Sequence, residues 1–94
     1  MGQAARAKPR RLSEKLLHIR QALGLTQSDL VRRLRLTAEL SRAKISEFER
    51  GEREPTLLVL LEYARVAGIC MDELADDKVD LPQRLPGTSK HRRS

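Results

Sequence analysis

The stretch SRAKISEFERG, residues 41–51, contains the spacing that decides how this chain folds. Its two large apolar residues, Ile45 and Phe48, are three apart and therefore lie on one side of a helix. Ser41 stands where a helix N-cap is expected, and Gly51 stands where a helix ends. The stretch therefore predicts a short helix with one side against a core and a charged side facing outward.

The preceding residues predict two more helices joined by a sharp turn. The first repeats leucine and isoleucine at helical spacing from residue 12, with Ser13 as a candidate N-cap and Gly24 at its end. Thr26 and Asp29 form a capping-box pattern at the start of the next helix. Because only Gly24 and Leu25 separate the two helices, the chain must turn sharply between them.

The following residues predict a fourth and a fifth helix. Pro55 prevents one helix from running through the turn that precedes the fourth, and Thr56 can cap that helix. The helix itself, LLVLLEYARVAG at 57–68, is strongly apolar and ends at Gly68. MDELADD at 71–77 predicts a short fifth helix. We expect four residues of the fourth helix to face the core: Leu57, Leu60, Leu61 and Ala64.

Composition places these helices in one small all-α domain. Only 2% of the 94 residues are aromatic, so Leu, Ile, Val and Ala must build the core, and such cores favour helices. We expect a compact five-helix domain over 12–77, a basic flexible tail at 1–11 and a basic, proline-containing tail at 78–94. Leu81 and Leu85 are able to fold back onto the domain.

The net charge of +6 belongs to the two tails. Residues 1–11 carry +4 and residues 78–94 carry another +4, which leaves −2 for residues 12–77. Within the domain, arginine and lysine concentrate between 32 and 53, whereas acidic residues concentrate at 72–77. Such a segregated charge is typical of a module that faces a polyanion. It also arises by chance in a chain that is 34% charged.

The sequence shows no pattern of an enzyme or a metal site. His18, His91 and Cys70 are not spaced like metal ligands, and no nucleophile–base set or phosphate loop is visible. We therefore expect no enzyme activity, no cofactor and no metal, with Cys70 as a half-buried structural thiol. A single cysteine, no signal peptide and no run of about 20 apolar residues predict a cytoplasmic protein without a membrane span.

Two charged residues fall on the inward sides of their helices. Arg20 follows Leu16 by four residues, and Glu49 follows Ile45 by four. A buried charge without a partner costs several kcal/mol. We therefore expect an ion pair between the first and third helices. The alternative is that both side chains reach the rim and stay solvated.

The chain resembles the helix-turn-helix family of Cro and the phage repressors, the xenobiotic-response-element type. The resemblance rests on GLTQSDLVRRL at 24–34 and on SRAKISEFERGEREPTLLVLLEYARVAGICMDEL at 41–74. It implies a lambda-repressor-like domain whose second and third helices form the helix-turn-helix, with the third helix in the DNA major groove. An arginine of helix one bonds a glutamate near the end of helix three in that family, which matches Arg20 and Glu49.

Three positions depart from the family pattern. Arg35 stands where a glycine usually turns the chain between helices two and three, and the link from there to Ser41 is longer than usual. Val31 replaces the usual alanine where these helices cross. Glu47 stands on the outward face, where glutamine or arginine is common. The longer link is able to tilt the third helix.

The resemblance also implies the residues that contact DNA. Residues 42–50 correspond to the recognition helix, on which Arg42 suits guanine O6 and N7 and Glu47 suits the N4 amine of cytosine. The residues expected at bases are Arg42, Ala43, Ser46 and Glu47. The residues expected at phosphates, including those at the anion-favouring start of helix two, are Thr26, Gln27, Lys44, Arg50 and Arg53. Without DNA, each of these belongs to a solvated helix face.

These patterns support two functions. The first is sequence-specific binding of double-stranded DNA by a small bacterial or phage-like transcriptional regulator. It would bind as a homodimer on half-sites about one helical turn apart, paired through the fifth helix with Leu81 and Leu85. The second is a protein-interaction module on the same fold, such as an antitoxin or adaptor. In that case the acidic residues 72–77 or a tail would bind a protein partner.

Overall fold

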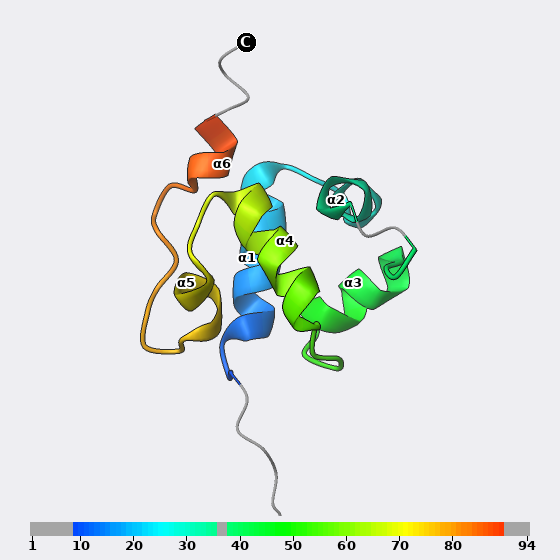
Figure 1. Ribbon diagram of the computed structural model, residues 1–94, viewed down its shortest axis with the longest axis horizontal. Helices are drawn as coiled ribbons and strands as arrows, with labels where there is room; N and C mark the ends of the chain where they lie inside the picture. The colour runs from blue at the N-terminus through cyan, green and yellow to red at the C-terminus, as the bar shows by residue number, and fades with distance from the viewer. Residues whose placement is uncertain (1–8, 36–37, 90–94) are drawn as a thin grey trace, which may run out of the picture.

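Five helices and one final helical turn follow each other along the part of the chain that the structure describes. The computed structural model describes residues 9–35 and 38–89, and this part of the chain is all-helical (Figure 1). The elements are α1 (Leu12–Leu23), α2 (Gln27–Leu34), α3 (Arg42–Glu49), α4 (Leu57–Ala67), α5 (Met71–Ala75) and the single turn α6 (Pro86–Ser89).

Side-chain caps and glycines set the ends of most helices. The hydroxyls of Thr26, Ser41 and Thr56 accept the N–H three residues further on at 3.0, 3.2 and 3.3 Å, respectively. α1 and α4 end at Gly24 and Gly68, whose φ angles of 71° and 74° are easily adopted by glycine. The caps predicted for the second, third and fourth helices are thus confirmed.

α1 begins without a side-chain cap of its own. The prediction of Ser13 as the N-cap is wrong, because the helix starts at Leu12 and places Ser13 inside the first turn. The carboxylate of Asp77 lies at this end instead. It accepts the N–H of Arg10 at 2.8 and 3.0 Å and that of Arg11 at 2.9 Å. The hydrogen bond from the N–H of Arg10, followed in size by that from Arg11, holds the pKa of Asp77 below its usual range.

A buried lysine ties α1 to the segment after α5. Lys15 is 2% exposed, and its ammonium donates to the carbonyl oxygens of Glu73, Asp76 and Val79 at 2.8, 3.0 and 2.6 Å, respectively. An ammonium has three hydrogens, so these bonds use its full donor capacity. The buried charge is therefore satisfied by carbonyl oxygens at and beyond the end of α5.

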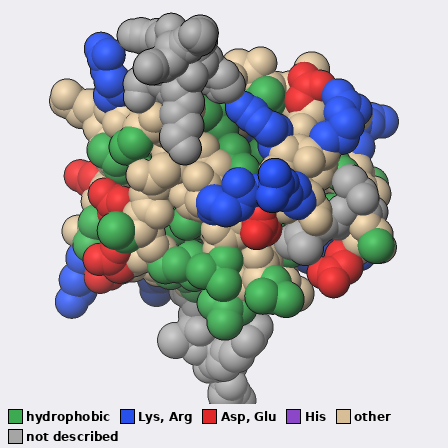
Figure 2. All heavy atoms as spheres, turned by 45° about the horizontal axis from the view of Figure 1, so that its top comes forward, with side chains coloured by type: hydrophobic (Ala, Val, Ile, Leu, Met, Phe, Trp, Pro, Cys, Tyr) green, Lys and Arg blue, Asp and Glu red, His purple; other side chains and the backbone are tan. Residues whose placement is uncertain are grey.

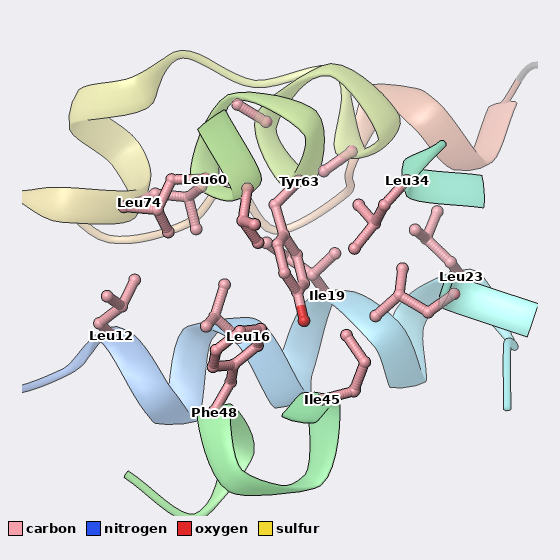
Figure 3. Packing of buried hydrophobic residues seen from close by; sticks show 14 of the residues in the cluster. Leu12, Leu16, Ile19, Leu23, Leu34, Ile45, Phe48, Leu60, Tyr63 and Leu74 are labelled. Atoms are coloured by element: carbon pink, nitrogen blue, oxygen red, sulfur yellow. The ribbon is translucent and has the colours of Figure 1, made fainter. Parts of the chain in front are cut away.

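The core lies where α1, α3 and α4 face one another (Figure 3). Tyr63 reaches from α4 toward α1 and α3, and its hydroxyl has no hydrogen-bond partner among the described residues. Burial, followed by the nearby charge of Glu49, raises the pKa of that hydroxyl. The largest fully buried side chains are Tyr63, Leu16, Ile19, Leu30, Leu34, Ile45, Leu74 and Leu85.

The inward side of α4 differs from the predicted one. Leu57 and Leu61, which we expected in the core, are 66% and 45% exposed, whereas Val59 and Tyr63 are buried. Leu60 and Ala64, the other two predicted positions, are buried as expected. The helix is apolar almost all round, so its periodicity does not select one side. Packing against α1, α2, α5 and α6 makes that selection.

Part of the expected C-terminal tail belongs to the folded domain. Leu85 is buried in the core and Leu81 packs against it, so Leu85 is not available for the dimer surface that we expected there. α6 lies against α4 so closely that a Cβ on Gly87 would overlap the carbonyl oxygen of Val66. The domain therefore extends beyond residue 77. The rest of the two predicted tails, residues 1–8 and 90–94, lies outside the described residues.

The link between α2 and α3 begins at a residue with a positive φ angle. Arg35 is exposed and has φ of 62°, in the left-handed region that a non-glycine side chain disfavours. Residues 36 and 37 lie outside the described part. Leu40 is buried and returns the chain to the core just before Ser41 caps α3.

Replacing Arg35 by glycine should stabilise the domain, because glycine adopts this conformation without the side-chain clash. We expect a gain of about 1 kcal/mol and a rise in Tm of about 4–8 °C. The matched variant R35A removes the same charge but keeps a Cβ, so it should gain nothing. Thermal unfolding followed by circular dichroism measures both. Equal gains in the two variants would mean that charge and not φ controls stability at this position.

The carboxylate of Asp77 should make stability fall at acid pH. A carboxyl group with a lowered pKa in the folded state stabilises the protein above its unfolded pKa of about 3.9, and this contribution disappears as the pH falls through the folded value. The Tm of D77N should therefore lie below that of the wild type at pH 7, and the difference should shrink as the pH falls from about 4 through the lowered folded pKa. D72N, at an exposed aspartate nearby, is the control and should change Tm little. A constant difference between D77N and wild type at all pH values would contradict this role.

Candidate nucleic-acid interface

A buried hydrogen-bond network fixes the position of α3. Arg20 of α1 donates to both carboxylate oxygens of Glu49, from Nε at 2.7 Å and from Nη2 at 3.1 Å. Its Nη1 donates to the carbonyl oxygen of Leu25 at 3.0 Å. Gln27 at the start of α2 adds a bond from Nε2 to Glu49 Oε1 at 3.1 Å. One carboxylate therefore joins α1, α2 and α3.

The network is largely withdrawn from solvent. The side chains of Arg20 and Glu49 are 18% and 5% exposed. The hydrogen bond to Glu49 is the main reason why the pKa of Arg20 is raised above its usual value. Ile45 and Phe48 are buried on the same side of α3. The inward side of this helix thus consists of two apolar residues and one compensated charge.

The opposite side of α3 faces outward, at the edge of the molecule in Figure 1. Arg42 and Ala43 are exposed, and Ser46 and Glu47 are half-buried. Arg42 makes no hydrogen bond or ion pair with the described residues. The structure therefore brings the four residues expected at bases to one side of α3, with a cation at its N-terminal end.

Glu47 is accompanied by an arginine. Arg53 Nε lies 2.5 Å from Glu47 Oε1, across the turn after α3 where Gly51 has φ of 75°. The contact uses one oxygen of the carboxylate. An isolated carboxylate on this side of α3 would repel the phosphates of a nucleic acid, and Arg53 compensates that charge.

Arg50 is also paired within the chain. Its Nε and Nη2 donate to the two carboxylate oxygens of Glu52 at 3.0 and 2.8 Å, and its Nη1 donates to Ser46 Oγ. Hydrogen bonding between Arg50 and Glu52 is the largest cause of the raised pKa of Arg50 and of the lowered pKa of Glu52. Exposed ion pairs of this kind contribute little to stability. Arg50 is therefore able to exchange Glu52 for another anion at small cost.

The other residues expected at phosphates have different environments. The hydroxyl of Thr26 caps α2, and Lys44 Nζ donates to the carbonyl oxygen of Glu39 at 2.9 Å. The side chain of Gln27, which we expected at a phosphate, donates one amide N–H to Glu49. Its second side-chain N–H and its backbone N–H, in the first turn of α2, remain for that role.

The described residues show neither a metal site nor a membrane-spanning helix. No group of three or more His, Cys, Asp or Glu in residues 9–35 and 38–89 is arranged to hold a metal ion. The expectation of a half-buried thiol is wrong, because Cys70 is exposed at the start of α5. Over the same residues, no helix combines the length and the apolar character that crossing a membrane requires. His91 lies outside the described residues.

The packing of α3 on α2, with a separate outward face, defines a helix-turn-helix protein. Residues 16–74, more than half of the chain, match the family described as Helix-turn-helix. The chain belongs to this family in its Cro and phage-repressor type, whose members are DNA-binding regulators. The predicted all-α, lambda-repressor-like fold is thus confirmed. The comparisons with curated proteins and with solved structures find no match.

Breaking the pair of Arg20 and Glu49 from one side should strongly destabilise the domain. R20M and E49M should each lose about 3 kcal/mol of unfolding free energy, because the remaining charge stays buried without its partner. The double variant R20M/E49M removes both charges and should recover much of that loss. Urea unfolding of the four proteins measures this. If the double variant loses the sum of the two single losses, the side chains act independently.

Proposed function

We propose that this protein binds double-stranded DNA in a sequence-specific way as a small transcriptional regulator, with residues 42–50 as its recognition helix. The observation that supports the proposal best is the anchoring of α3. Glu49, Ile45 and Phe48 hold its inward side, so the outward side is a rigid surface. A helix presented in this way suits the width of the DNA major groove.

The outward side chains suit direct contact with bases. The guanidinium of Arg42 has no partner among the described residues and is able to donate two hydrogen bonds to guanine. Glu47 is able to accept from the N4 amine of cytosine with the oxygen that Arg53 does not hold. Ala43 suits a thymine methyl group, and Ser46 suits several base edges.

The surrounding cations suit the phosphate backbone. We assign phosphate contacts to the start of α2, through Thr26 and the backbone N–H of Gln27, and to Lys44, Arg50 and Arg53. Such contacts position the protein without reading sequence. The pair of Arg50 and Glu52 would open when a phosphate replaces the carboxylate, whereas Arg53 would keep its bond to Glu47 while facing the backbone.

We further propose that the protein acts in the cytoplasm as a homodimer, with no cofactor and no catalytic activity. A single module of this size buries little surface area against DNA, so two copies on two half-sites give the affinity that a regulator needs. The basic residues of 1–8 and 90–94 would add phosphate contacts and increase the salt dependence of binding.

The alternative, an antitoxin or adaptor that binds a protein, has less support. Most carboxylates of the acidic segment 72–77, the surface expected to bind that partner, already accept hydrogen bonds from other parts of this chain. The Glu73 carboxylate accepts the N–H of Cys70, that of Asp76 accepts the N–H of Lys78, and Asp77 binds the start of α1. These carboxylates stabilise α5 and its neighbours, which leaves fewer of them for a partner.

Removing two arginines from the proposed interface should weaken DNA binding. R42A/R50A should bind its selected operator at least about tenfold more weakly and reduce the slope of log K against log salt by about 1–2. The matched control is K78A/R84A, which removes two exposed cations from the segment between α5 and α6, away from α3 in Figure 1, and should change neither quantity much. Fluorescence anisotropy on sites selected from random DNA, over a series of salt concentrations, measures both. Salt-independent binding together with a co-purifying protein would favour the antitoxin or adaptor function.

A further inference from the structure

Glu47, on the outward side of α3, is held by a residue from beyond that helix. Arg53 Nε lies 2.5 Å from Glu47 Oε1, and the side chains of Arg53 and Glu47 are 51% and 31% exposed, respectively. The contact occupies Oε1 and leaves Oε2, which has no hydrogen-bond partner in the described part of the chain. The carboxylate is therefore fixed at one oxygen and open at the other.

The turn after α3 brings Arg53 back to this helix. The N–H of Gly51 donates to the carbonyl oxygen of Phe48 at 3.1 Å. The N–H of Glu52 donates to the carbonyl oxygen of Glu47 at 2.9 Å. Together with the φ angle of 75° at Gly51, these bonds form the Schellman motif that ends many helices. The backbone thus fixes the place from which Arg53 reaches the carboxylate.

The sequence separation of the pair shows that the turn is needed. Glu47 and Arg53 are six positions apart, so on one continuous helix their side chains would lie on different sides. Because the Schellman turn reverses the chain, the guanidinium returns to the outward side of α3. The contact is therefore a product of the turn and not of helical periodicity.

Other surface pairs of opposite charge have their carboxylates away from the recognition helix. Figure 2 shows basic and acidic side chains next to each other on one face of the molecule. Three such pairs of the described residues join positions two or three apart: Asp29–Arg32, Arg50–Glu52 and Glu62–Arg65. Exposed pairs contribute little to stability. The pair of Glu47 and Arg53 differs because its carboxylate belongs to the side of α3 proposed to face bases.

We propose that Arg53 is a positioning residue for Glu47 and thereby makes the operator position that Glu47 reads specific for cytosine. The inference rests on the DNA-binding function proposed above. It adds base selection to the phosphate contact of Arg53.

A carboxylate with one open oxygen suits cytosine best of the four bases. In the major groove, cytosine presents the N4 amine as a donor, whereas guanine presents two acceptors and thymine an acceptor and a methyl group. Adenine presents its N6 amine beside the N7 acceptor, which repels a carboxylate. Only at cytosine does Glu47 Oε2 therefore meet a donor without an acceptor beside it.

Arg53 supports this readout in two ways. A free glutamate side chain samples several rotamers, and fixing it on a base costs conformational entropy. The bond to Arg53 holds the carboxylate before DNA binds, so less entropy is lost at that step. The guanidinium also compensates the charge that phosphates would repel. Without Arg53, the carboxylate would turn to solvent and the position would lose its preference for one base.

The test measures the base preference at every position of the operator selected from random DNA. The position read by Glu47 is the one whose preference E47A removes. There, wild type should bind cytosine at least about tenfold more tightly than any other base, a ratio typical of one mismatched base pair. R53A should lower this ratio to about twofold or less and keep the preferences at the other positions. Its overall affinity should also fall, because a phosphate contact is lost.

The matched control is R50A, which removes another cation of the same turn. Arg50 donates to Ser46 and Glu52 and makes no hydrogen bond to Glu47. R50A and R53A should each reduce the slope of log K against log salt by about 1. Only R53A should remove the preference for cytosine at the position that Glu47 reads.

The outcomes separate this role from the function on which it rests. An unchanged cytosine ratio in R53A, or an equal loss of that ratio in R50A, would overturn the positioning role and leave the DNA-binding function intact. The same holds if E47A removes no preference or if wild type selects a base other than cytosine there. Failure of wild type to select any site from random DNA would overturn the function itself, and this role with it.

Discussion

The carboxylate of Glu49 is the point on which the arrangement of this domain depends. It receives hydrogen bonds from Arg20 of α1 and Gln27 of α2 and so sets the orientation of α3 relative to both. In most helix-turn-helix proteins of this type a tight turn contributes to that orientation. Here the link is longer and starts with Arg35 at a φ angle of 62°, so the side-chain network is the anchor of α3 that the structure shows most clearly.

Most features that depend on neighbouring residues were predictable from the sequence, and most that depend on distant residues were not. The exceptions are the cap expected at Ser13, which is absent, and the pair of Arg20 and Glu49, which is present. The caps at Thr26, Ser41 and Thr56 involve residues only three positions apart, and the structure contains all three. The inward side of α4 is set by packing against other helices. Because α4 is apolar almost all round, its sequence does not show which side faces the core. Leu85 follows a proline-containing stretch that resembles a tail, yet the core holds it.

In the candidate interface, too, some features were predictable from the sequence and others were not. The positions on the outward side of α3 follow from helical periodicity, but their partners do not. Arg53 reaches Glu47, and Arg50 reaches Glu52, only because the chain reverses at Gly51. Lys15 was missed although its signal was present, since it lies on the apolar stripe of α1 just as Arg20 does.

The bonds of Lys15 and Asp77 also determine when this domain can mature during synthesis. They connect α1 with residues 58 to 67 positions further along the chain. A nascent chain that ends after α4 therefore has neither the carbonyl oxygens that satisfy the Lys15 ammonium nor the carboxylate that holds the start of α1. The start of α1 therefore gains its final hydrogen bonds only after the chain has been synthesised as far as residue 79.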